Sequence, residues 1–242
     1  MSRSNGKPGK WDVLIVDDHP VVRHGLAQLI NQECDLEVCA QAENATETMT
    51  AVAAHPPDVV VLDLSLGENS GLAVIKELRG VLPDLPILIL SMHDEFLYAE
   101  RALRAGANGY IMKEEATSKV IEAIRRVLRG EIHVSERMAT RLLGKMVTGA
   151  SPEVRSPVET LSDRELEVFE MIGRGLKTHD IAERLHISPK TVEAHRGNIK
   201  AKLKLKNSIE LLQYATQWVQ STSQHAGAGV AEPSPVSLLA KS

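Results

Sequence analysis

Short apolar runs alternate with amphipathic segments from Trp11 to about Leu128, which predicts five repeats of strand and helix. Apolar runs bounded by turn residues are typical of buried parallel strands, because helices cover both faces of such a sheet. We therefore expect a doubly wound α/β domain with a five-stranded parallel sheet. The strands are expected at Asp12–Val16, Glu37–Gln41, Val59–Leu62, Ile87–Leu90 and Gly109–Met112, and the helices at about Pro20–Gln32, Ala45–Ala54, Gly71–Arg79, Glu95–Ala105 and Thr117–Arg129.

The pattern changes after this region and becomes helical throughout. A connecting helix is expected over Glu131–Val147, and Thr148–Thr160 has the two prolines and the glycine of a linker. Helical periodicity then continues from Leu161 to about Val219. These shifts predict a disordered N-terminus over 1–10, an α/β domain over 11–130, a connecting helix and linker over 131–160, a small all-α domain over 161–220 and a disordered tail over 221–242.

Polar side chains stand where four of the predicted strands end. In an open α/β sheet the carboxyl ends of the strands lie at one edge, where ligands bind. Carboxylates gathered there repel one another and resist burial, and a divalent cation would offset that repulsion. The residues concerned are Asp17, Asp18, Asp63, Ser91 and Lys113.

This set of side chains suits phosphoryl chemistry on Mg²⁺, a cation that prefers hard oxygen ligands and binds phosphate groups. Asp63 directly follows its strand, so its carboxylate can attack a phosphoryl group as a nucleophile. Lys113 would supply a positive charge to the phosphoryl oxygens, and the Ser91 hydroxyl would hydrogen-bond the new phosphate. A phosphatase of the haloacid dehalogenase class is the enzyme alternative. It needs a second aspartate two residues later, where this chain has Ser65.

Composition limits the kinds of partner and the cellular compartment that we expect, but it does not indicate an activity. The 242 residues carry a net charge of −4, so a nucleic-acid partner would have to meet a local basic patch. Cys34 and Cys39 match no metal motif in their spacing, and we interpret them as ordinary thiols in a reducing cytosol. Apolar runs are shorter than the ~18 residues of a membrane span, and Met1–Lys10 lacks the apolar core of a signal peptide. A cytoplasmic protein without a membrane partner is expected.

Taken together, the strand-end residues resemble the receiver domain of two-component response regulators, with its flavodoxin/CheY-like fold. The resemblance covers about Trp11–Arg129. It implies that Asp63 is the phosphoacceptor and that Asp18 and Asp63 bind Mg²⁺ by their side chains, with Asp17 orienting waters of the metal site and the Ser65 carbonyl as a further ligand. It also implies that Ser91 and Tyr110 are the hydroxyl and aromatic switches beside Lys113. Two positions depart from the family pattern: Gly67 and Glu114 stand where many receivers have proline.

The C-terminal region predicts a helix-turn-helix. Ser162 and Glu165 form a capping-box pattern that opens a helix, and Gly173 and Gly175 follow it. A short helix is expected at about Thr178–Leu185 and a longer one at about Pro189–Leu205, joined by a tight turn. The second helix has Val192, Ile199 and Leu203 on its core face. From His186 to Lys206 the chain has six basic residues and a single acid, Glu193, which suits DNA phosphates.

Three motifs carry a second resemblance. They are Leu-Ser-Asp-Arg-Glu-Leu-Glu-Val-Phe (161–169), His-Asp-Ile-Ala-Glu-Arg-Leu (179–185) and Ser-Pro-Lys-Thr-Val-Glu-Ala-His-Arg (188–196). Together they closely resemble the LuxR-type DNA-binding domain of NarL/FixJ regulators. The resemblance implies that Glu193, Ala194 and Gly197 lie at base edges and that Lys190, Thr191, Arg196 and Lys200 lie near phosphates. His195 leans toward the core face, and His179 stands where the family often has asparagine.

The last helix, expected over Ser208–Val219, has two apolar stripes. One contains Leu212 and Val219, and the other contains Leu211, Tyr214, Ala215 and Trp218. One stripe can pack on its own domain. The other, by resemblance to the family, would mediate a homodimer that binds half-sites about one helical turn, or a multiple, apart. The alternative is that both stripes pack inside the domain and simply enlarge its core.

These inferences predict a phosphorylation-controlled transcriptional regulator and not an enzyme. A sensor histidine kinase would phosphorylate Asp63 with Mg²⁺, and the C-terminal domain would then bind double-stranded operator DNA. Two alternatives stay open: a DNA-binding protein whose first domain is a constitutive dimerisation module, and a stand-alone signalling module or enzyme without DNA affinity. A small-molecule sensor is disfavoured, since the first half has few aromatic residues to line a pocket.

Overall fold

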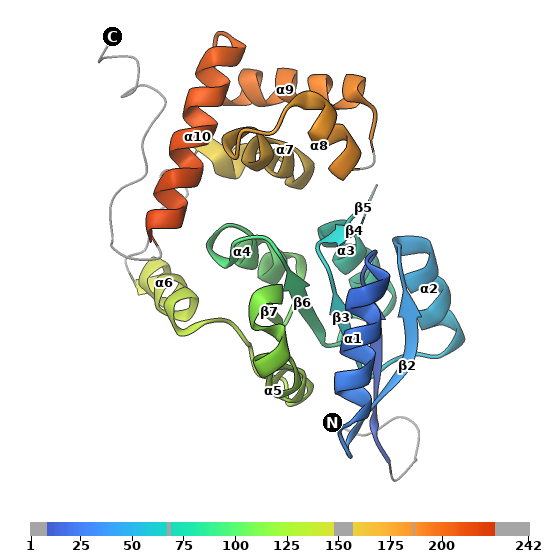
Figure 1. The fold of residues 1–242 in the computed structure, drawn as a ribbon. Coiled ribbons are helices and arrows are strands. Elements are labelled where there is room, and N and C mark those ends of the chain that lie inside the picture. The colour runs from blue at the N-terminus through green and yellow to red at the C-terminus, as the bar shows by residue number, and fades with distance from the viewer. Residues whose placement is uncertain (1–8, 67–68, 148–156, 186, 226–242) are drawn as a thin grey trace. The chain divides into compact units, whose positions relative to one another are not determined.

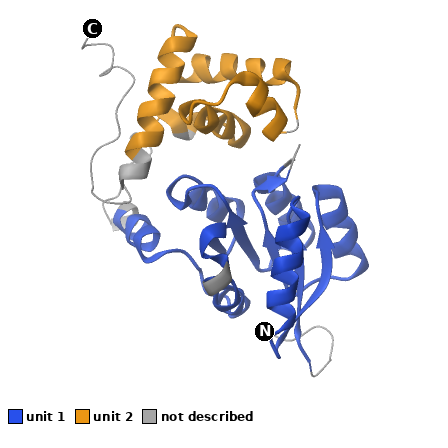
Figure 2. Ribbon diagram, in the orientation of Figure 1, with its two compact units in different colours: residues 1–146 blue, residues 147–242 orange. Residues whose placement is uncertain are grey.

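A computed structural model describes residues 9–66, 69–147, 157–185 and 187–225. The chain divides into two compact units, Met1–Met146 and Val147–Ser242 (Figure 2). Each unit has its own buried core and is treated by itself below. Gly67 and the predicted linker residues before Pro157 lie outside the described residues, as do residues 1–8 and 226–242.

The first unit is built on a five-stranded parallel sheet in the order β2-β1-β3-β6-β7 (Figure 1). This is the flavodoxin-like order, so the predicted fold class is confirmed. A two-stranded antiparallel piece, β4 (Ser65–Leu66) with β5 (Asn69–Ser70), follows β3 and was not predicted. The strands of the main sheet are β1 (Trp11–Val16), β2 (Leu36–Ala42), β3 (Val59–Leu62), β6 (Ile87–Ser91) and β7 (Gly109–Met112).

Helices cover both faces of this sheet. α1 (Pro20–Asn31) and α5 (Ala116–Leu128) share one apolar core with the strands. α2 (Ala45–Ala54), α3 (Gly71–Val81) and α4 (Glu95–Ala105) contact one another in succession. The strands therefore bury both faces, which explains their uninterrupted apolar runs.

The segment that follows α5, residues 131–147, is called the connecting arm below. It begins with extended backbone instead of the helix predicted from Glu131. The His133 backbone N–H donates to Asn108 O (3.0 Å), and the Tyr110 N–H donates to His133 O (2.7 Å), so the arm pairs with the free edge of β7. Helix α6 starts only at Glu136 and runs to Val147. The prediction was wrong for 131–135 for two reasons. Gly130 has a positive φ (79°) that turns the chain, and the edge of β7 has backbone groups with which an extended segment can form hydrogen bonds.

The second unit is helical, and three of its boundaries differ from the predictions. Residues Pro157–Thr160, expected in the linker, form a 3₁₀ helix. The longer helix of the pair ends at Leu203, because Lys204 adopts a left-handed conformation (φ 56°) that stops it. The last helix continues to His225, past the expected end near Val219 and into the tail predicted to be disordered, since no glycine or proline interrupts it there. The helices are α7 (Asp163–Gly173), α8 (Thr178–Arg184), α9 (Pro189–Leu203) and α10 (Ser208–His225).

An aromatic cluster joins α10 to α7. The Phe169 ring centroid lies 5.8 Å from that of Tyr214 and 5.3 Å from that of Trp218. A Cβ atom added at Gly173 would lie 2.4 Å from the Ala215 carbonyl oxygen, so the two helices approach closely because residue 173 has no side chain. The stripe with Leu211, Tyr214, Ala215 and Trp218 is therefore the one that packs on its own domain.

Candidate functional site

The carboxylates gather at the carboxyl ends of β1 and β3, where the strand order reverses. Val16 of β1 pairs with Leu62 of β3, and the Asp63 N–H donates to Val16 O at 2.8 Å. This register places Asp17 beside Asp63, and their exposed fractions are only 1% and 2%. Burying two carboxylates side by side is unfavourable without a compensating cation.

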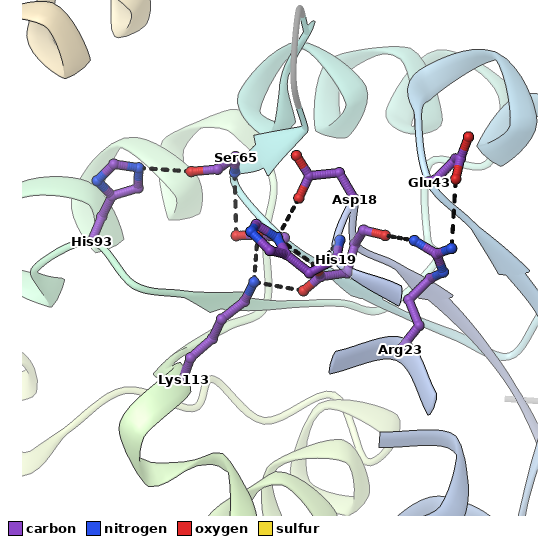
Figure 3. Close-up of polar contacts among 9 residues, drawn as sticks. Asp18, His19, Arg23, Glu43, Ser65, His93 and Lys113 are labelled. Carbon is purple, nitrogen blue, oxygen red and sulfur yellow. Dashed lines mark hydrogen bonds and ion pairs between the residues drawn. The ribbon is translucent and has the colours of Figure 1, made fainter. Parts of the chain in front are cut away.

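Lys113 supplies one positive charge to this pair. Its Nζ lies 2.6 Å from Asp17 Oδ2 and 2.6 Å from Asp63 Oδ2 (Figure 3). The lysine directly follows β7, two strands away from β3 in the sheet, so the parallel topology brings it to the cluster. The structure thus joins three of the residues that the sequence places at strand ends.

Burial and the local charges shift the titration of this cluster. Burial raises the pKa of Asp63 to about 6; the Lys113 charge opposes that change and the Asp17 charge adds to it. Burial would lower the pKa of Lys113, but its contacts with Asp63 and Asp17 hold that pKa above its ordinary value. Lys113 therefore stays charged, while the carboxylates still lack full compensation.

The donor set at this edge suits a hard divalent cation. Ligand atoms of Asp17, Asp18, His19 and Asp63 all lie within 4.8 Å of one another. The His19 Nδ1 atom is 2.6 Å from Asp18 Oδ1 and so occupies part of this space in the present arrangement. Three carboxylates fit the oxygen preference of Mg²⁺, whereas the exposed imidazole can move away without disturbing the core.

Ser91 and Tyr110 meet at His93, a residue that the sequence reasoning missed. The Ser91 hydroxyl accepts from the His93 N–H (3.1 Å), and the Tyr110 hydroxyl donates to His93 O (2.8 Å). The His93 ring also reaches Ser65, with 2.9 Å between Nε2 and Oγ (Figure 3). The Ser65 N–H in turn donates to Asp63 Oδ1 (3.2 Å), so a chain of contacts runs from the acidic cluster to Tyr110.

A second unpredicted residue holds the loop after β1. The Arg23 guanidinium donates to Asp17 O and lies 3.5 Å from Glu43 Oε2 (Figure 3). Arg23 therefore fixes the backbone that carries the first two aspartates. No sequence motif singles it out, because its role depends on the three-dimensional path of the loop.

Helix α9 contains all seven residues that the sequence assigns to DNA. Ser188 caps it by accepting from the Thr191 N–H (3.1 Å), and Pro189 occupies the first turn. Val192, Ile199 and Leu203 are buried, as predicted for the core face. Lys190, Thr191, Glu193, Ala194 and Gly197 are exposed, and Arg196 and Lys200 are half-buried.

Contacts with α8 and α7 orient parts of this surface. The Thr178 hydroxyl donates to Glu193 Oε1 (2.7 Å), and Arg196 Nη1 donates to Thr178 Oγ1 (3.3 Å). Lys202 is held differently, since its Nζ contacts the buried Glu165 at 2.6 Å. Glu165 completes the predicted capping box with Ser162. The Lys202 side chain remains 40% exposed, and its charge is paired with that of Glu165.

Among the described residues, we find no helix that combines the length and the apolar character needed to cross a bilayer.

Two protein families match this chain. The pattern described as "Response regulator receiver domain" matches residues 13–125, and that described as "Bacterial regulatory proteins, luxR family" matches residues 159–215. The first match contains the acidic cluster and Lys113, and the second contains α7 to α9 and the first part of α10, as far as Ala215.

Curated relatives match this chain over most of its length. The oxygen regulatory protein NreC of Staphylococcus epidermidis is 42% identical over 209 residues, which cover 84% of this chain and 95% of that protein. NreC of Staphylococcus carnosus is 40% identical over 208 residues, with the same shares covered. Among solved structures, RcsB of Salmonella enterica serovar Typhimurium, bound to promoter rprA in the presence of phosphomimetic BeF3⁻, is 26% identical with a TM-score of 0.55 and covers 86% of this chain and 98% of its own.

Proposed function

Because this chain belongs to the NarL/FixJ family of two-component response regulators, we propose that phosphorylation of Asp63 controls operator binding by helix α9. The observation that carries the proposal is the contact of Lys113 Nζ with both Asp17 and Asp63, 2.6 Å from each carboxylate. A buried lysine held between two carboxylates is poised to receive the phosphoryl oxygens. A site without a ligand would gain nothing from burying this excess of negative charge.

The phosphoryl donor is a phosphohistidine of a sensor histidine kinase. An Asp63 carboxylate oxygen attacks the phosphorus, the new P–O bond forms as the P–N bond breaks, and the imidazole leaves. Lys113 then pairs with phosphoryl oxygens. The Ser91 hydroxyl, now accepting from the His93 N–H, turns to hydrogen-bond the phosphate.

Mg²⁺ would be held by the side chains of Asp17, Asp18 and Asp63 and by the Ser65 carbonyl. It would supply positive charge that offsets the carboxylates and the incoming phosphate. Water later hydrolyses the phosphoryl–Asp63 bond, which releases inorganic phosphate and restores the carboxylate. The protein is therefore a regulator and not an enzyme with its own substrate turnover.

The arm is our candidate for carrying the signal out of the first unit. Movement of Ser91 disturbs His93, whose carbonyl accepts from the Tyr110 hydroxyl, while the Tyr110 N–H pairs with His133. Glu95 anchors the next turn, because its Oε1 atom accepts from the Ser135 N–H (2.8 Å). A shift at Tyr110 is therefore passed to the segment that begins α6.

Operator DNA is read by α9, with Glu193, Ala194 and Gly197 at base edges and Lys190, Thr191, Arg196 and Lys200 near phosphates. Glu193 can accept from cytosine and Ala194 can contact a thymine methyl group. The predicted second stripe of α10 consisted of Leu212 and Val219, but Val219 is half-buried and lies close to Gly173. Leu212 (46% exposed) and its neighbour Ile209 (68% exposed) are therefore our candidates for a homodimer contact. Such a dimer would bind paired half-sites of chromosomal DNA, which sets its action in the cytoplasm.

The decisive experiment combines phosphorylation with footprinting. Wild-type protein with acetyl phosphate and Mg²⁺ should gain a phosphoryl group and protect operator fragments at lower concentration. Asp63→Asn should lose both the label and the gain. Asp84→Asn, an exposed carboxylate in the loop before β6, is the matched control and should retain both.

Two outcomes would contradict the proposal in different ways. Labelling that persists in Asp63→Asn would overturn the site assignment. Unchanged DNA protection with and without acetyl phosphate would favour the alternative in which the first unit is a constitutive dimerisation module.

A further inference from the structure

A second group of ligand-type side chains lies at the opposite edge of the sheet. Asp12 is near the start of β1, Cys39 is in β2, and His55 follows the end of α2. Their ligand atoms lie within 4.8 Å of one another. Asp17 comes five residues after Asp12, or about 16 Å along an extended strand, so this group is separate from the acidic cluster.

We propose that Asp12, Cys39 and His55 bind a Zn²⁺ ion. A carboxylate oxygen, a thiolate sulfur and an imidazole nitrogen are the three donor types that zinc takes in proteins. Mg²⁺ and Ca²⁺ prefer oxygen alone, so a site with sulfur and nitrogen selects against them. Three protein ligands leave one tetrahedral position for water or another donor.

The chain path directs the cysteine toward this group. β1 and β2 pair at Val13 with Val38 and then at Leu14 with Ala40, so Cys39 is the extra residue of a bulge. A bulge changes the direction of a side chain relative to regular pairing. The Cys39 Sγ atom lies 3.5 Å from Val13 O, a weak contact that a metal–sulfur bond can replace.

The other two ligands are already paired and accessible. The His55 Nε2 atom lies 2.9 Å from Asp12 Oδ2, with exposed side-chain fractions of 59% for His55 and 36% for Asp12. Bond lengths of about 2.0–2.3 Å around tetrahedral zinc put ligand atoms about 3.3–3.6 Å apart. The exposed histidine can make the remaining adjustment by side-chain rotation.

The surroundings favour a cation. Asp58 brings a second carboxylate, whose Oδ2 atom accepts from the Asp12 N–H at 2.8 Å. Burial, together with the Asp12 charge, raises the pKa of the Cys39 thiol to about 11, so the metal-free site holds a neutral thiol beside carboxylates. On binding, the thiol releases its proton to solvent and the thiolate bonds to the ion.

An ion pair between Asp12 and His55 is the simpler reading, and it predicts no metal affinity. Cobalt separates the two readings, because thiolate ligation gives Co²⁺ a charge-transfer band in the near ultraviolet. The metal-stripped full chain, with excess Mg²⁺ to occupy the acidic cluster, would be titrated with Co²⁺ and then with Zn²⁺ against a chromophoric chelator.

The wild-type protein should develop the thiolate band with one equivalent of Co²⁺ and lose it when Zn²⁺ displaces the cobalt. Cys39→Ser should lose the band and bind Zn²⁺ at least about tenfold more weakly. Cys34→Ser, the exposed cysteine five residues earlier, is the matched control and should behave as wild type. His55→Asn changes an exposed side chain, so it should fold normally, keep a weaker band and also lose at least about tenfold in Zn²⁺ affinity.

The proposal is overturned if wild-type protein shows no thiolate band, or if the band survives Cys39→Ser and disappears with Cys34→Ser. It is also overturned if His55→Asn binds Zn²⁺ as tightly as wild type. None of these outcomes depends on Asp63 or on DNA.

Discussion

The Tyr110 hydroxyl donates a 2.8 Å hydrogen bond to the backbone carbonyl oxygen of His93, two residues after Ser91. Only 1% of Tyr110 is exposed, so its ring already lies inside the first unit. The hydroxyl switch and the aromatic switch expected from the sequence are therefore connected through one intervening residue.

Replacing Tyr110 by Phe removes this hydrogen bond and keeps the buried ring. We expect the free energy of unfolding to fall by about 0.5–1.5 kcal/mol, the usual net contribution of one hydrogen bond. We also expect acetyl phosphate to increase DNA affinity less than in wild type. Denaturant titration and footprinting measure the two effects; wild-type behaviour in both would show that the bond does not participate in signalling.

Replacing Asp63 by Asn should stabilise the protein at neutral pH. The folded-state pKa of about 6 exceeds the ordinary 3.8, so the folded chain binds more protons at Asp63 than the unfolded chain between these values. Wild-type stability should therefore fall as pH rises from about 4 to 6, and asparagine removes that loss. The gain should be about 1–3 kcal/mol at pH 7 and should vanish near pH 4.

Thermal unfolding across this pH range, without divalent cations, measures the difference. Added Mg²⁺ should stabilise wild type more than Asp63→Asn. A variant that is less stable than wild type at pH 7 would mean that the contact with Lys113 outweighs the burial of the charge.

Replacing Gly109 by Ala should weaken the pairing of the arm. An added Cβ would lie 3.0 Å from His133 O and 2.9 Å from Leu88 Cδ1, and such crowding costs about 1–3 kcal/mol. We expect faster amide hydrogen exchange at 131–135 and a smaller response of DNA binding to phosphorylation. Gly80→Ala is the control, since its Cβ meets nothing within 4 Å and alanine in α3 should raise stability by about 0.5–1 kcal/mol. Equal amide hydrogen exchange at 131–135 in both variants would show that the pairing of the arm does not depend on its contact with Gly109 of β7.

Replacing Lys190 by Ala should weaken DNA binding for all sequences alike. One lost phosphate contact should make the slope of log affinity against log salt less steep by about 0.9. Lys76→Ala, an exposed lysine on α3, should leave the slope unchanged. If Lys190→Ala instead altered base preference at constant slope, this lysine would be a base-reading residue.

The sequence predicted the sheet and the strand-end cluster well for a physical reason. Buried parallel strands need continuous apolar runs, so their ends are conspicuous, and parallel topology alone brings Asp17, Asp63 and Lys113 to one edge. The contacts of Arg23 and His93 could not be predicted in this way, because they depend on how two loops fold back on the cluster. The same holds for Cys39, whose partners are distant in the sequence and adjacent only through a bulge.

The second unit contains both features that the sequence predicts and features that it does not. Capping residues and core spacing predicted where α7 and α9 begin, since these signals are local. The end of α9 at Leu203 was not predicted, because few residues other than glycine adopt the left-handed conformation that Lys204 has here. Which stripe of α10 is buried also depended on a distant contact, the approach of Gly173 to Ala215.

The pairing of His133 with β7 has a practical consequence for dissecting the protein. An edge strand with unpaired N–H and C=O groups is a template for association with other chains. A receiver fragment that stops at Leu128 would leave the outer edge of β7 open and would be prone to aggregation. A fragment that extends through Ser135 keeps that edge occupied and also retains the hydrogen bond to Glu95, so it is the better unit for study in isolation.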